Sequence, residues 1–65
     1  MNSPTDFGLQ KIAYDVAETA SMLSIGRTTL YGLVKSGDIR ATKLGRRTLF
    51  LAVDIATFLT KARGQ

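Results

Sequence analysis

Cations and hydroxyl side chains gather in the middle of this chain, where together they could bind phosphate groups. Residues 27–49 carry six Lys or Arg residues and a single acidic residue, Asp38. Such a surplus favours a polyanion because it supplies long-range attraction and charged hydrogen-bond donors. The candidate binding residues form two groups. They are Arg27, Thr28, Thr29, Tyr31 and Lys35 in the first, and Lys43, Gly45, Arg46, Arg47 and Thr48 in the second.

The residue types that most catalytic and metal sites need are missing. The 65 residues include no cysteine and no histidine, which excludes thiol nucleophiles, histidine bases and zinc-finger ligation. We therefore expect no enzymatic activity, no cofactor and no metal. The 45% apolar content predicts a folded domain, and no apolar run approaches the roughly 20 residues of a membrane helix. With no secretory signal visible, a cytoplasmic protein without a membrane partner is expected.

The first group of candidates needs helices to position it. Residues 1–11 lack any helical or strand period and are expected to form a flexible N-terminal arm, with residues 12–65 as the folded domain. Asp15 followed by Glu18 is typical of a capping box, in which each residue's side chain accepts from the other's backbone amide. This pair predicts a helix over about 16–23.

A second helix is predicted over about 27–36, with Gly37 as its left-handed stop. Two short helices joined by three residues are typical of a helix-turn-helix. The face expected to pack on the core carries Leu30, Leu33 and Val34. At about 100° per residue, the opposite face carries Thr28, Tyr31, Gly32 and Lys35. Short hydroxyl and aromatic side chains flanked by cations suit the base edges and phosphates of a duplex.

The second group lies in a predicted β-hairpin. Ile39 and Ala41 indicate its first strand and residues 48–51 its second, around a turn at 44–47. Apolar residues at helical spacing then predict a third helix. These are Val53, Ile55, Phe58, Leu59 and Ala62. The expected fold class is therefore α+β: a small winged helix-turn-helix in the order helix, helix, β-hairpin, helix.

Each group also has an ordinary structural explanation. Thr28 and Thr29 are residue types that commonly cap a helix start, and a tyrosine such as Tyr31 is often a half-buried packing residue. Hairpin tips are often basic because they are solvated. The order of the elements favours binding, because a basic wing beside a polar-faced helix would straddle a phosphate strand.

The chain resembles the excisionase and AlpA-like helix-turn-helix family over residues 14–62. The resemblance rests on the run 17–31, above all Arg27-Thr28-Thr29-Leu30-Tyr31, on 35–39 with its glycine, and on Lys43-Leu44-Gly45-Arg46-Arg47. It implies a winged-helix domain related to the DNA-binding part of the MerR regulators. It also implies DNA contacts from Arg27, Thr28, Tyr31 and Lys35 in the helix and from Lys43, Arg46 and Arg47 in the wing. Gly26 and Gly32 depart from the family's usual residues.

What the resemblance implies is a recombination directionality factor, which binds and bends attachment-site DNA beside a separate integrase so that a mobile element is excised. Further copies of the chain would bind adjacent sites. A small transcriptional regulator of a phage or integrative element is the alternative. A protein-interaction module is a third reading, which would need an apolar exposed face on the second helix. Since the chain stops at Gln65, without a MerR-type effector domain, no small-molecule effector is expected. The expected location is the bacterial nucleoid.

Overall fold

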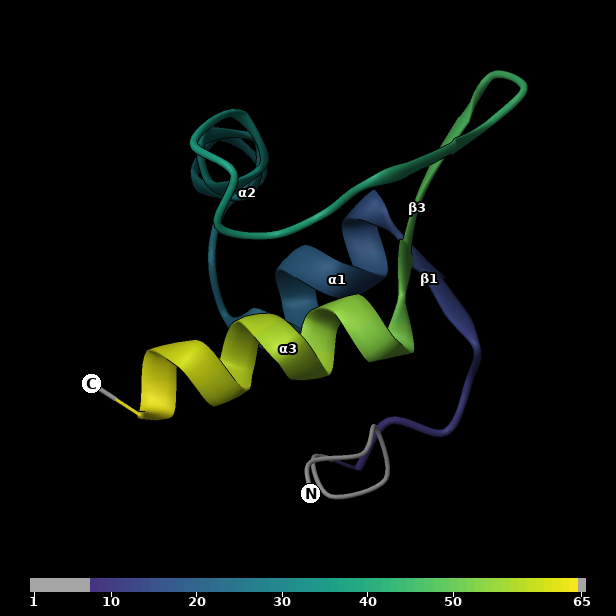
Figure 1. Cartoon of the computed structure of the whole chain (residues 1–65). Helices are drawn as coiled ribbons and strands as arrows, with labels where there is room; N and C mark the ends of the chain where they lie inside the picture. The colour runs from purple at the N-terminus through teal and green to yellow at the C-terminus, as the bar shows by residue number, and fades with distance from the viewer. Residues whose placement is uncertain (1–7, 65) are drawn as a thin grey trace.

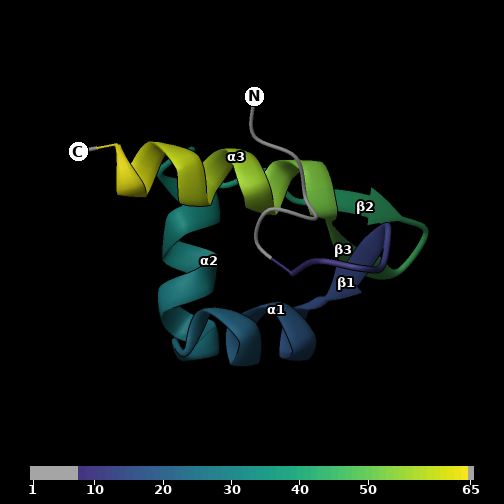
Figure 2. The same cartoon turned by 90° about the horizontal axis from the view of Figure 1, so that it is seen from below.

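The computed structural model describes residues 8–64, and residues 1–7 and 65 lie outside the described part. Three antiparallel strands form one sheet in the order β1-β3-β2. Figure 2 shows α2 crosswise to α1 and α3, and Figure 1 shows the hairpin of β2 and β3 projecting away from the helices. The predicted α+β winged helix-turn-helix is confirmed. Its elements are β1 (Ala13–Asp15), α1 (Val16–Leu23), α2 (Arg27–Lys35), β2 (Thr42–Leu44), β3 (Arg47–Leu51) and α3 (Ala52–Arg63).

The first helix, α1, begins at the predicted capping box. The backbone N–H of Glu18 donates to Asp15 Oδ1 at 2.7 Å, and the backbone N–H of Asp15 donates to Glu18 Oε1 at 3.0 Å. Thr19 is fully buried, and its hydroxyl donates to the Asp15 carbonyl at 2.8 Å. This start of α1 therefore satisfies its polar groups from within the chain.

The second helix, α2, ends at Lys35, one residue before the predicted end, and Ser36 is its C-cap. Gly37 has a φ of 85°, a left-handed conformation that glycine adopts without steric cost. Its N–H donates to the Val34 carbonyl at 3.1 Å, and the N–H of Asp38 donates to the Leu33 carbonyl at 2.9 Å. This pair of bonds is a Schellman motif, so the predicted glycine stop is confirmed.

The hairpin begins later than the sequence predicts. β2 starts at Thr42, and Ile39 lies in the core with 2% of its surface exposed. The backbone N–H of Ile39 donates to the Leu33 carbonyl, which holds it at the end of α2 and out of the sheet. Pairing of Leu44 with Arg47 leaves Gly45 and Arg46 as a two-residue loop. Gly45 has a φ of 60°, and a positive φ at the first loop position is typical of a type II′ turn.

The first strand, β1, is an element that the sequence pattern does not predict. It pairs with β3 so that Tyr14 lies opposite Phe50, and both side chains are buried. Three residues are too few to show strand alternation, and the pairing partners of β1 lie far along the chain. Only the folded chain brings these two strands together.

The core lies between the helices and the face of the sheet that carries Tyr14 and Phe50. Phe50, Leu30 and Ile55 are the largest fully buried apolar side chains, and Leu33 and Val34 pack against them as expected. The third helix departs from its predicted apolar face, because Val53 is mostly exposed. The buried residues of α3 are Ala52, Ile55 and Ala56.

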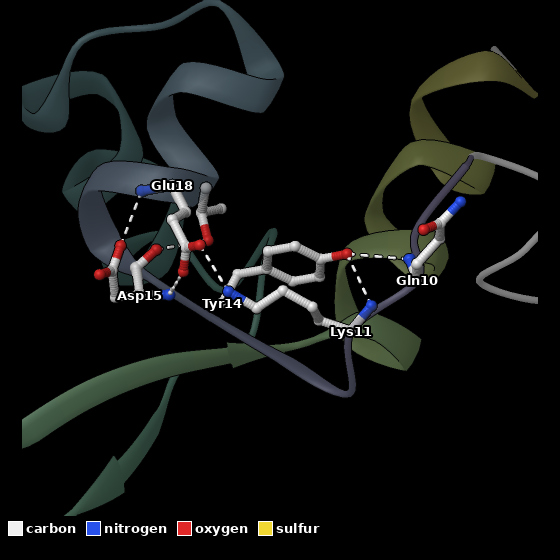
Figure 3. Close-up of polar contacts among 6 residues, drawn as sticks. Gln10, Lys11, Tyr14, Asp15 and Glu18 are labelled. Atoms are coloured by element: carbon white, nitrogen blue, oxygen red, sulfur yellow. Dashed lines mark hydrogen bonds and ion pairs between the residues drawn. The ribbon is translucent and has the colours of Figure 1, made fainter.

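The expected flexible arm covers residues 1–11, of which residues 1–7 lie outside the described part. For the remainder the structure differs from the expectation. Leu9 is buried in the core, and the backbone N–H groups of Gln10 and Lys11 both donate to the Tyr14 hydroxyl at 3.0 Å (Figure 3). The packed domain therefore reaches back at least to Leu9, because β1 supplies a tyrosine whose hydroxyl accepts from the segment before it.

Candidate nucleic-acid interface

One face of α2 is turned outward, as its periodicity predicts. Leu30 is fully buried, whereas its neighbour Tyr31 is 51% exposed. Figure 1 shows α2 end-on, on the same side of the molecule as the hairpin. All five residues of the first group are exposed, namely Arg27, Thr28, Thr29, Tyr31 and Lys35.

The N-terminus of α2 is free of capping side chains. Its N-cap is Gly26, and no side-chain hydrogen bond caps this end. Thr28 and Thr29 lie inside the helix, so the ordinary explanation of these threonines as N-caps is wrong. The first turn contains Arg27 and no acidic residue. Free backbone amides, the positive end of the helix dipole and a guanidinium therefore coincide where a phosphate oxygen would be favoured.

The wing is the hairpin of β2 and β3, and the second group of candidates lies on both of its faces. Side chains alternate along a strand, so Lys43 and its partner Thr48 share the face of Phe50. Arg47 lies on the opposite face with Leu49, which pairs with Asp15 of β1. Lys43, Gly45, Arg46 and Arg47 are exposed, and Thr48 is half-buried. The cations of the hairpin therefore lie on different faces and do not form a single cluster.

Lys11 and Glu18 form an ion pair beside the start of α1. Lys11 Nζ lies 2.5 Å from Glu18 Oε2, and this hydrogen bond is the main reason that the pKa of Glu18 is lowered and that of Lys11 raised (Figure 3). The backbone N–H of Asp15 also lowers the pKa of Glu18, and the positive charge of Arg47 adds to the effect. The contribution of Arg47 is the smallest of these causes.

Several other cations have no acidic partner in the described part of the chain. Lys11 and Glu18 form an ion pair, whereas no hydrogen bond or ion pair holds the side chains of Arg27, Lys35, Lys43 or Arg46 among residues 8–64. Arg40, which belongs to neither predicted group, is a further exposed cation without such a partner. Exposed cations without internal partners are available to an external anion.

Other kinds of site find less support in the described residues. Over residues 8–64, no group of three or more His, Cys, Asp or Glu side chains could hold a metal ion. No helix in this range is long and apolar enough to cross a membrane.

Comparison with known proteins agrees with this geometry. A family model described as a helix-turn-helix domain matches residues 13–63, which run from the first residue of β1 to the last residue of α3. Searches of curated proteins and of solved structures gave no match. Because the family match includes both helices of the helix-turn-helix, the wing and the closing helix, the chain belongs to the helix-turn-helix domain family of small DNA-binding domains.

Proposed function

We propose that this chain binds double-stranded DNA sequence-specifically, with α2 in the major groove and the wing against the neighbouring backbone. The observation that carries the proposal is the exposed face of α2, where Thr28 and Tyr31 lie between Arg27 and Lys35. Hydroxyl and aromatic groups of this kind reach base edges, while the two cations and the uncapped N-terminus attract phosphates. DNA-binding helix-turn-helix proteins use their second helix in this way.

The wing supplies a sequence-independent contribution. Lys43 in β2 and Arg46 in the two-residue loop are exposed and have no partner among residues 8–64. Each lost phosphate contact should reduce the slope of log K against log salt concentration by about 0.9. Arg46→Ala should therefore weaken binding to target and random duplexes alike.

A salt titration of duplex binding by fluorescence anisotropy tests this assignment. Tyr31→Ala and Thr28→Ala should lower the preference for a selected target duplex over a random one, with little change in salt slope. Arg46→Ala should lower the slope and leave that preference intact. Full affinity in the triple variant Thr28→Ala, Tyr31→Ala, Arg46→Ala would contradict the proposed interface.

The specific role that we infer is that of an excisionase, or recombination directionality factor. It would bind and bend attachment-site DNA and direct a separate integrase toward excision of a mobile element. Support comes from the resemblance at Arg27-Thr28-Thr29-Leu30-Tyr31 and Leu44-Gly45-Arg46-Arg47, and from family membership. Catalysis would belong to the integrase, since this chain carries neither cysteine nor histidine.

One module of this size covers few base pairs, so adequate affinity calls for several copies on adjacent sites. Single modules bury about 600–1,000 Å² of protein surface, and bending a site costs of order 1–6 kcal/mol. Excision by the cognate integrase should require this chain. Sedimentation with attachment-site DNA should show that several copies of the chain bind cooperatively. Unchanged excision without the chain, together with altered transcription from a nearby promoter, would favour the role of a small transcriptional regulator instead.

A further inference from the structure

The segment between α2 and β2 fixes the backbone on both sides of Arg40. Before it, Ile39 is 2% exposed, and its backbone N–H donates to the Leu33 carbonyl at 3.3 Å. After it, Ala41 packs against the core. Arg40 itself is exposed. Arg40 therefore lies on a backbone held by core residues, in the segment between α2 and β2. Figure 1 shows this segment joining α2 to the hairpin.

No acidic side chain neutralises Arg40 within the described part of the chain. Asp38, the nearest acid in sequence, accepts from the Ser36 hydroxyl at 2.7 Å at the end of α2. Asp15 and Glu18 form the capping box of α1. Arg40 makes no hydrogen bond or ion pair through its side chain among residues 8–64. Because the backbone at Arg40 is already held, only the freedom of its side chain is lost on meeting a phosphate, and its planar guanidinium can donate two parallel hydrogen bonds.

We propose that Arg40 binds the DNA backbone between the two contacts already assigned, on the phosphate strand that separates the groove occupied by α2 from the wing. The inference rests on the proposed function, because it assumes that α2 and the wing engage the same duplex. When they do, one phosphate strand runs past the segment that connects them. Arg40 then fixes the register of the domain on the backbone without reading sequence.

The test is a salt titration of binding to a random-sequence duplex, on which phosphate contacts dominate. Arg40→Ala should reduce the slope of log K against log salt by about 0.9. Arg40→Lys keeps the charge and should retain most of the slope. Lys61→Ala is the matched control, since Lys61 is an exposed cation on α3 and its removal changes net charge equally. Circular dichroism should show that all three variants stay folded, as exposed substitutions cost within about 0.5 kcal/mol.

The outcomes separate this inference from the proposed function. A wild-type slope in Arg40→Ala, alongside a reduced slope in Arg46→Ala, overturns the role of Arg40 and leaves the DNA-binding interface standing. An equal loss in Lys61→Ala overturns it as well, because net charge would then explain the effect. Absence of duplex binding by the unmodified chain overturns both proposals.

Discussion

Two sides of this small domain use charge in opposite ways. At the start of α1, Lys11, Tyr14, Asp15 and Glu18 satisfy one another, and we name these four residues the cap cluster. The exposed residues of α2 and the wing form the other side, the basic face, where most cations have no partner among residues 8–64. Charged side chains that bond to other groups of the chain stabilise the fold, whereas unpaired charged side chains remain available to a ligand. Substitutions in the cap cluster should therefore alter stability, and those on the basic face should alter binding.

The largest contrast is expected between two neighbouring residues of α2. Leu30→Ala should lower the free energy of unfolding by roughly 2–5 kcal/mol, because it empties a fully buried position. Tyr31→Ala, on the basic face, should change it by within about 0.5 kcal/mol while weakening DNA binding. Urea denaturation followed by circular dichroism measures both. Equal destabilisation by the two variants would place Tyr31 in the core and remove it from the basic face.

The next largest effect is expected in the cap cluster. Tyr14→Phe removes the hydroxyl that accepts from the backbone N–H groups of Gln10 and Lys11. Leaving these part-buried amides unpaired should cost about 1–3 kcal/mol. Urea denaturation measures the loss, and the DNA affinity of the folded variant should stay that of the unmodified chain. A loss of affinity without a loss of stability would show that the two sides are not independent.

A smaller effect is expected at the joint between α2 and the wing. Gly37→Ala forces a side chain into a left-handed conformation and should cost about 1–2 kcal/mol, although the added methyl group meets no neighbouring atom. Gly32→Ala is the matched control, because Gly32 lies inside α2 and is equally uncrowded. It should raise stability by roughly 0.5–1 kcal/mol. Thermal denaturation of the pair should therefore give shifts of opposite sign, and shifts of the same sign would refute the conformational explanation.

The smallest effect concerns the titration of Glu18. Its pKa lies below the usual 4.5 in the folded chain, chiefly through the hydrogen bond from Lys11. A carboxylate whose pKa is lowered by folding stabilises the fold above its unfolded pKa, and this contribution is lost as pH falls through the folded value. The urea midpoint should thus fall at acidic pH more steeply in the unmodified chain than in Glu18→Gln. Identical pH profiles would exclude Glu18 as a source of the cap cluster's stability.

The sequence by itself determined the features that depend on neighbouring residues. Asp15 and Glu18 form the predicted capping box, and Gly37 forms the predicted stop of α2. Helical spacing also identified Leu30 as buried and Tyr31 as exposed. These features are local because a cap, a left-handed turn and a helix face each depend on residues within about one helical turn.

Only the tertiary structure decided the features that depend on distant partners. β1 exists because Tyr14 meets Phe50, and Leu9 joins the core beside them. Isoleucine is common in strands, yet the backbone N–H of Ile39 donates a hydrogen bond to the Leu33 carbonyl near the end of α2. The register between β3 and β1 decides the face of the sheet on which Arg47 lies, and this register cannot be predicted from neighbouring residues. Strand pairing joins residues far apart in sequence, and a shift of one residue moves every side chain to the other face, so these features are fixed only when the chain folds.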